Sequence, residues 1–163
     1  MADSAFERIA AAVDPPMVIV TARAGDESDG CLVGFSTQCS IEPARYLVCL
    51  SKANRTYEIA SNATTLVVHM LHDDPVGMWL ARLFGEVSAY ETDKLSMCAW
   101  EEGPVGTPVV AGCDWFAGPI RSRVDLGDHV GYTLDVTDGK TNSSREPYLG
   151  YARVRDLDAG NPA

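Results

Sequence analysis

Short apolar runs, set apart by turn residues, recur along the whole of this 163-residue chain. Runs rich in β-branched residues and bounded by Gly, Pro, Asn and Asp predict strands. Most neighbouring runs lack an intervening helix, which favours an antiparallel barrel or sheet with a few peripheral helices over a doubly wound parallel sheet. The predicted strands span residues 17–22, 31–40, 46–51, 64–71, 109–116, 120–125, 129–137 and 148–154.

Helices are expected at only a few places. Ser4 and Glu7 form a capping-box pattern at the start of a first short helix. Asn54 is a candidate N-cap for a second short helix. The clearest helix begins after Asp74 and ends before Gly85, because it carries a proline at its first position and an apolar stripe. The chain is therefore predicted to be mainly β.

Charge and cysteine usage narrow the class of protein. The sequence has 23 acidic and 13 basic residues, a formal net charge of −10. Such a body repels phosphate backbones and anionic lipid, so neither nucleic acid nor a membrane is an expected partner. The N-terminus lacks the basic region of a signal peptide, and five scattered cysteines without CxxC spacing are typical of reduced thiols. We therefore expect a cytoplasmic protein.

A first polar tract interrupts the predicted strand at 31–40. Period-two alternation places its polar members, Ser36, Gln38 and Ser40, on one side of the strand. The pattern fits a strand that turns hydrogen-bonding groups toward a ligand, but by itself it favours a strand with one face in solvent. The tract reads Gly34, Phe35, Ser36, Thr37, Gln38, Cys39 and Ser40.

A second polar tract lies where the strand at 46–51 gives way to the helix at Asn54. Unsatisfied backbone N–H groups and the positive end of the helix dipole meet at such a junction. Lys52 and Arg55 add two cations, so the junction is a candidate cradle for one phosphate. A capped helix with surface cations explains the same residues equally well. The tract reads Leu50, Ser51, Lys52, Ala53, Asn54, Arg55 and Thr56.

A third tract, at 125–131, contains Gly127, Asp128 and His129. In their order and spacing, the three tracts resemble those of the flavin reductase-like family. Members of that family fold as an FMN-binding split antiparallel β-barrel. The resemblance covers about residues 13–154 of a single domain, 1–163. It implies that residues 34–40 line the isoalloxazine edge, with Ser36, Thr37 and Gln38 at the polar rim of the ring. It also implies that Ser51, Lys52, Asn54, Arg55 and Thr56 hold the ribityl chain and the phosphate.

The resemblance further implies a role for His129 beside the flavin and the nicotinamide, where it would orient either ring. A histidine at a strand start that bonds to backbone or to Asp128 is the plainer interpretation. The implied activity is that of a homodimeric NAD(P)H:flavin oxidoreductase. It would bind FMN or FAD, take hydride from NADH or NADPH, and supply reduced flavin to a partner monooxygenase. The alternatives are an FMN-binding electron carrier or storage protein, and a relative that has lost flavin or takes a deazaflavin.

Other patterns are assigned to structure. His69 and His72 lie three residues apart in a strand pattern, which puts them on opposite faces, so we expect no metal site. Cys39 is expected to be a small buried residue rather than a redox thiol, and Trp79 to be a core residue. The sequence has neither a Rossmann fingerprint nor a Walker A motif.

Overall fold

A computed structural model describes residues 4–141 and 147–160. Its helices are α1 (Ala5–Ala12), α2 (Arg55–Ala60) and α3 (Pro75–Glu86), with 3₁₀ turns at Lys94–Met97, Pro104–Gly106 and Tyr151–Arg153. Its strands are β1 (Val18–Ala24), β2 (Glu27–Val33), β3 (Ser36–Ser40), β4 (Arg45–Ser51), β5 (Thr65–Met70), β6 (Trp100–Glu102), β7 (Pro108–Val110), β8 (Asp114–Asp125), β9 (His129–Asp135) and β10 (Asp138–Lys140).

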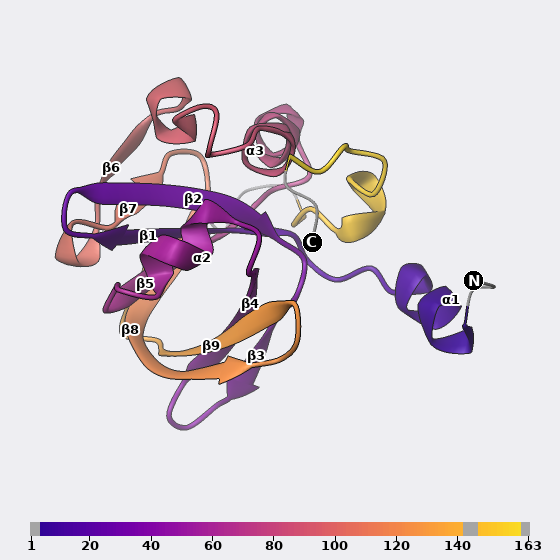
Figure 1. The fold of residues 1–163 in the computed structure, drawn as a ribbon, viewed down its shortest axis with the longest axis horizontal. Helices are drawn as coiled ribbons and strands as arrows, with labels where there is room; N and C mark the ends of the chain where they lie inside the picture. The colour runs from indigo at the N-terminus through magenta and orange to yellow at the C-terminus, as the bar shows by residue number, and fades with distance from the viewer. Residues whose placement is uncertain (1–3, 142–146, 161–163) are drawn as a thin grey trace.

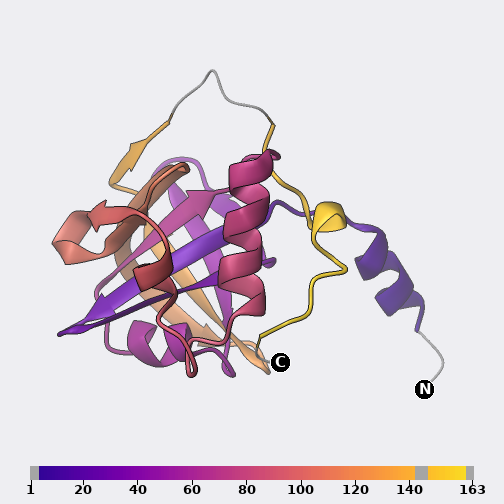
Figure 2. The same ribbon diagram turned by 90° about the horizontal axis from the view of Figure 1, so that it is seen from above.

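One curled antiparallel sheet forms the body of the molecule (Figure 1). Its strand order is β2-β1-β5-β8-β9-β4-β3, with β10 paired to β8, while β6 and β7 form a small separate sheet. The curl brings β8, β9, β4 and β3 around to one side, and α2 and α3 lie at the periphery (Figure 2). The expectation of a mainly β, antiparallel fold with few helices is confirmed.

The sheet buries side chains on both of its faces. Inside the curl, Val20, Val48 and Tyr132 belong to one cluster, to which α2 contributes Ile59. On the other face, a second cluster includes residues of α3 such as Phe84. Because β1 and β5 are covered on both faces, their sequences read as continuous apolar runs rather than as an alternation.

The prediction of a single strand at 31–40 is wrong, because this segment contains the end of β2 and the whole of β3. β2 ends at Val33 after pairing with β1, whereas β3 begins at Ser36 and pairs with β4 at the far edge of the sheet. Gly34 and Phe35 form the crossing between them. Residues 27–30, which lie outside the predicted strands, belong to β2.

Other predictions are also wrong. The single strand predicted at 109–116 is the end of β7 and the start of β8, separated by residues 111–113. The break predicted between the strands at 109–116 and 120–125 is absent, because β8 continues through Gly118 and Pro119 and exchanges its partner β5 for β9 at that point. A proline is tolerated where a strand changes partners, since it cannot donate to a ladder. Residues 148–154 form isolated bridges and a 3₁₀ turn instead of a strand. Trp79 lies on the outer side of α3 and is about half exposed.

No helix among the described residues is long and apolar enough to cross a membrane.

Candidate functional site

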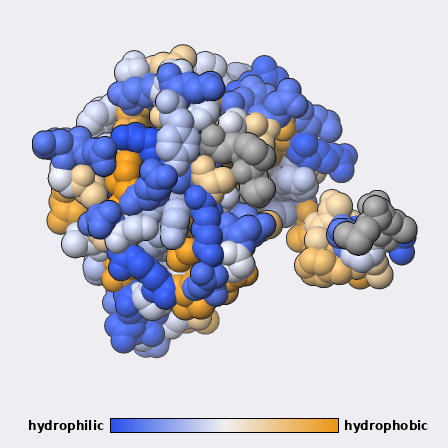
Figure 3. All heavy atoms as spheres, viewed as in Figure 1, coloured by the Kyte–Doolittle hydropathy of each residue, from blue (hydrophilic) through white to orange (hydrophobic). Residues whose placement is uncertain are grey.

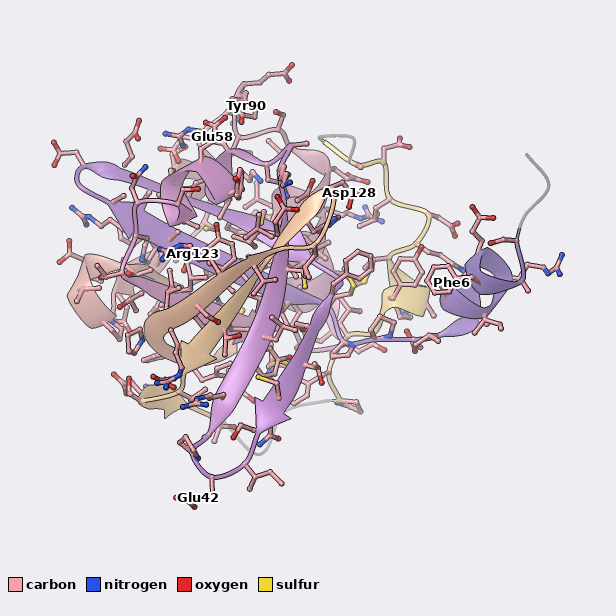
Figure 4. All side chains as sticks on the ribbon, turned by 60° about the horizontal axis from the view of Figure 1, so that its bottom comes forward. Phe6, Glu42, Glu58, Tyr90, Arg123 and Asp128 are labelled. Atoms are coloured by element: carbon pink, nitrogen blue, oxygen red, sulfur yellow. The ribbon has the colours of Figure 1, made fainter. Side chains whose placement is uncertain are left out.

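The three polar tracts meet at one end of the sheet. Ser51, the last residue of β4, pairs with His129, the first residue of β9. The N–H of Lys52 donates to the carbonyl of Asp128 (2.9 Å), and the N–H of Cys49 donates to the carbonyl of Phe35 (2.9 Å). The start of β3, the end of β4 and the β8–β9 turn are thus neighbours, although they are about 95 residues apart in sequence at the extremes. Figure 4 labels Asp128 in this turn.

His129 lies at the centre of this end of the sheet. Its Nδ1 is 2.7 Å from Oδ1 of Asp128, and this hydrogen bond lowers the pKa of the Asp128 carboxyl. Its ring lies 5.0 Å from the ring of Phe35, at a tilt of 55°. The Asp128 partner of the plainer interpretation is therefore present, and Phe35 places a second, exposed ring beside the imidazole. Phe35 is an exposed aromatic surface next to a polar, proton-bearing group.

Lys52 extends from the strand–helix junction into solvent. Its Nζ is 2.8 Å from Oδ2 of Asp125, the last residue of β8. This hydrogen bond raises the pKa of Lys52 and lowers the pKa of Asp125. Exposed ion pairs contribute little to stability, so an incoming anion can replace the carboxylate without disrupting the fold.

The other members of the second tract divide between the surface and the interior. Arg55 is half buried, with Nη2 3.7 Å from Oε1 of Glu27 in β2. Thr56 is fully buried, and its hydroxyl donates to Oδ2 of Asp29 (2.8 Å). Leu50 is also fully buried, in the core cluster inside the curl. The structure therefore turns Thr56 and Leu50 into the fold, away from the surface on which Lys52 lies.

The first tract forms the edge strand of the sheet. The hydroxyl of Ser36 lies 2.9 Å from that of Tyr46, and a bulge separates Gln38 from Ser40. Cys39 is exposed, so the expectation that it is buried is wrong; an edge strand has no neighbour on one side to cover it. An edge strand also presents a row of backbone N–H and C=O groups to a ligand. The expected site residues that are exposed or half buried are Gly34, Phe35, Ser36, Thr37, Gln38, Cys39, Ser40, Ser51, Lys52, Asn54, Arg55 and His129.

An open groove lies beside Arg55. It has a volume of about 700 Å³ and runs between the tip of the β1–β2 hairpin and residues 89–95, with Arg23 and Tyr90 in its walls. A smaller cavity of about 330 Å³ lies at Asp114, at the other end of β8 from the β8–β9 turn. The larger groove is therefore the one that adjoins the second polar tract, at Arg55.

A buried charge cluster behind α2 was not predicted from the sequence. Asp29 and Lys94 are both buried, and Nζ of Lys94 donates to the carbonyls of Gly30 (3.0 Å) and Phe84 (3.2 Å). Burial raises the pKa of Asp29 and lowers that of Lys94. Since Asp29 accepts the hydroxyl of Thr56, the cluster fixes the first turn of α2. The sequence gives little sign of this cluster, because Asp29 lies in a segment that is not predicted to be a strand.

His69 is a structural residue. Its Nδ1 lies 3.0 Å from the carbonyl of Ile19, and its Nε2 accepts the N–H of Val110 (2.9 Å). Complete burial lowers the pKa of His69 to about 4, so the ring is neutral at neutral pH. Across residues 4–141 and 147–160, no group of three or more potential metal ligands comes together.

Comparison with known proteins identifies the family. The model of the flavin reductase like domain matches residues 11–158. The chain belongs to this family. A curated relative, the reductase subunit of a stachydrine N-demethylase from Rhizobium meliloti, is 28% identical over 145 residues, which are 85% of this chain and 59% of that protein. The chain spans between 42% and 62% of the length of the curated relatives it matches.

Solved structures share the fold at lower identity. A flavin reductase domain protein from an Arthrobacter species matches with a TM-score of 0.80 and 19% identity, over 97% of this chain and 94% of that one. An NADH:FAD oxidoreductase from Streptomyces globisporus matches with a TM-score of 0.77 and 22% identity, over 86% of this chain and 83% of that one. These similarities establish the curled half-barrel as the fold of the family.

Proposed function

We propose that this protein is an NAD(P)H:flavin oxidoreductase that binds FMN where β3, β4 and the β8–β9 turn meet. The observation that carries the proposal is the pairing of Ser51 with His129, beside Phe35, because it unites the three tracts of a flavin reductase like domain in one place. Proteins of the same fold include an NADH:FAD oxidoreductase and a component B of nitrilotriacetate monooxygenase from Mycobacterium thermoresistibile. These similarities support reduced flavin as the product, which the protein would supply to a partner monooxygenase.

The residues present fit a flavin phosphate ester. Lys52 and the half-buried Arg55 supply cations, and Ser51 and Asn54 supply polar side chains at the junction that would hold the ribityl chain and phosphate. The backbone of β3, with Ser36, Thr37 and Gln38, would border the polar rim of the ring system. The buried hydroxyl of Thr56 takes no direct part; it anchors the junction through Asp29.

A bound flavin would supply the chemistry by accepting a hydride from NADH or NADPH. The protein's own contribution is to hold the two rings in contact and to exclude other orientations. Phe35 offers one face of the binding surface, and His129, fixed by Asp128, offers a ring nitrogen to orient the nicotinamide or the reduced flavin. We further propose that the protein is a cytoplasmic homodimer with the flavin near the subunit interface.

Removing both cations tests where the phosphate is held. Replacing Lys52 and Arg55 together with alanine should raise the Kd for FMN about 10- to 100-fold, because two charge-assisted hydrogen bonds are lost. Riboflavin, which lacks the phosphate, should bind almost as before. The double variant Lys140→Ala/Arg155→Ala removes the same charge from exposed positions elsewhere and serves as the control. Equal weakening of FMN and riboflavin would refute the assigned phosphate site.

Anaerobic mixing separates a reductase from an electron carrier. The carrier is the second candidate, because the chain is also 27% identical over 143 residues to a high molecular weight rubredoxin from Moorella thermoacetica. NADH or NADPH added to the flavin-loaded protein should bleach the flavin at a catalytic rate. Absence of bleaching with both donors, despite tight flavin binding, would favour the carrier.

A further inference from the structure

The open groove beside Arg55 carries an excess of negative charge. It lies between residues 89–95 and the tip of the β1–β2 hairpin, a hydrophilic region at the left of Figure 3. Two of its described lining residues, Arg23 and Arg55, are basic and five are acidic, so the lining has a formal charge of −3. The acidic residues are Asp26, Glu27, Glu91, Asp93 and Glu102.

Both arginines of this groove already face a carboxylate. Nη1 of Arg23 lies 3.3 Å from Oε1 of Glu102, and it also donates to the carbonyl of Gly106 (3.2 Å). Nη2 of Arg55 lies 3.7 Å from Oε1 of Glu27. This second separation is too long for a hydrogen bond, so Arg55 can turn to a phosphate at the mouth of the groove. Inside the groove, the remaining carboxylates set the sign of the charge.

The wall at residues 89–95 is tied to α2. The hydroxyl of Tyr90 donates to Oε1 of Glu58 in α2 (2.7 Å), and Figure 4 labels both residues. The N–H of the next residue, Glu91, donates to the carbonyl of Ser88 (3.1 Å). These bonds hold the backbone that carries Glu91 beside the groove. A ligand that enters the groove therefore meets its negative charge there.

The groove lies where a ligand would extend beyond the proposed phosphate position. Nζ of Lys52 is bonded to Asp125 (2.8 Å), on the side of the β8–β9 turn and His129. Arg55 is paired with Glu27 on the opposite side, at the groove. A flavin with its ring beside His129 and its phosphate between Lys52 and Arg55 would direct any further group past Arg55. That path leads into the groove.

FMN and FAD carry a similar charge in different places. The phosphate monoester of FMN holds about −1.5 to −2 charge at pH 7 on a single group. In FAD, each of two linked phosphates carries one negative charge, and adenosine follows. The whole charge of FMN would therefore lie between Lys52 and Arg55, whereas the second charge of FAD would lie in a groove that is already negative.

Two of the acidic residues can be changed without breaking other contacts of the groove. Glu27 and Glu102 are paired with arginines, and Asp93 caps the following 3₁₀ turn. Asp26 and Glu91 are exposed on opposite walls, one at the hairpin tip and the other in the segment at 89–95. They are the positions at which the charge of the groove can be altered alone.

We infer, on the basis of the proposed function, that the carboxylates of this groove select FMN against FAD. Asp26 and Glu91 repel the second phosphate of a dinucleotide flavin and leave the single phosphate of FMN at the mouth. They are specificity-determining residues, which act on the part of the ligand that distinguishes the two flavins.

Calorimetric titration of the purified protein with FMN and with FAD tests this selection. In about 0.01 M salt, where charges are little screened, the wild type should bind FMN at least about tenfold more tightly. Asp26→Asn/Glu91→Gln should lower the Kd for FAD about 5- to 10-fold and change the Kd for FMN less than about twofold. Glu42→Gln/Asp138→Asn removes the same charge from exposed positions outside the groove and should change neither Kd.

Two further measurements separate repulsion from shape. Glu91→Lys changes the charge by the same two units at one position, so it should improve FAD binding by a similar factor. In about 0.5 M salt, the Kd values of wild type and neutral variant for FAD should agree within about twofold, because exposed charges are screened. A difference that persists at high salt would show that the groove discriminates by shape and would overturn the inference.

The outcomes also distinguish this selection from the proposed function. A protein that binds neither flavin refutes the proposed function and the selection with it. A wild type that binds FAD as tightly as FMN, or variants of Asp26 and Glu91 that leave the Kd for FAD unchanged, refute the selection alone.

Discussion

Replacing Lys94 with methionine should destabilise this protein strongly, because the lysine is a charge held in the interior. Lys94 is 2% exposed, and the carboxylate that its charge attracts, Asp29, is 3% exposed. The ammonium also donates to two buried carbonyls, those of Gly30 and Phe84. Methionine has a similar length and fills the same space, so the change removes the charge and the donors with little change in packing.

The expected loss of unfolding free energy follows from the buried groups that remain in the variant. The variant leaves Asp29 as a buried carboxylate that keeps its hydrogen bond from Thr56 but loses Lys94, the stronger of the two cations, Lys94 and Arg55, that lower its pKa. Removing one of two buried, opposite charges costs up to about 3–5 kcal/mol of unfolding free energy. With a urea m-value of about 2 kcal/mol/M, the midpoint should fall by about 2 M. Adding Asp29→Asn should recover part of this loss, because no unpaired charge then remains inside.

The loss should also depend on pH. Burial raises the pKa of Asp29 above its ordinary 3.8, so the folded state binds the proton more tightly than the unfolded chain does. The penalty of the charged carboxylate is complete above the raised pKa and disappears as pH falls below the unfolded value. Loss of Lys94 raises the pKa of Asp29 further. The stability difference between variant and wild type should therefore narrow on acidification.

Urea unfolding followed by circular dichroism at pH 7.5 and pH 5 measures both effects. Lys140→Met, at an exposed position on β10, is the matched control and should change little. The reasoning is refuted if Lys94→Met costs less than about 1 kcal/mol, the range of surface ion pairs. It is equally refuted if the double variant with Asp29→Asn loses the sum of the two single losses.

Three further outcomes are expected. Because burial lowers the pKa of His69 to about 4 from 6.5, stability should fall by about 3 kcal/mol as pH drops from 6.5 to 4, and His69→Gln should lack this slope in thermal melts. An aromatic disulfide reagent should modify the exposed Cys39 rapidly, and Cys39→Ser should abolish this fast phase. Cys31 is buried and its pKa is raised to about 11, so it should react only on unfolding. Gly118→Ala should lower the Tm by roughly 5–10 °C, because a Cβ there collides with a backbone carbonyl of β9, while Gly34→Ala, which meets only ordinary contacts, should change it little.

The sequence predicts strands well where local residues decide the structure and poorly where pairing decides it. β1 and β5 stand out because burial on both faces demands continuous apolar residues. The break at Gly34 cannot be recognised from the local sequence, because the alternation continues through it. What changes is the pairing partner, which is β1 up to Val33 and β4 from Ser36 onward. Gly118 and Pro119 look like a turn for the same reason: a change of strand partner and a turn both tolerate a residue that donates no hydrogen bond.

The candidate site shows the same division. Its tracts are recognisable in the sequence, but their convergence depends on the antiparallel register that places Ser51 opposite His129. Residue type alone also suggests that Thr56 faces a ligand. Its true partner, Asp29, is 27 residues upstream on β2, and no local pattern connects the two.

That partnership explains why a marginally stable protein keeps a buried charge cluster beside its candidate site. The proposed phosphate cradle is weakly ordered by itself, since α2 has only six residues and Lys52 is exposed. The hydrogen bond from Thr56 to Asp29 ties the first turn of α2 to β2, and Lys94 neutralises the carboxylate that makes this bond. Burying two charges costs free energy, but the buried cluster holds the junction in place before a ligand binds. A junction that is ordered in advance can bind a ligand tightly through few contacts.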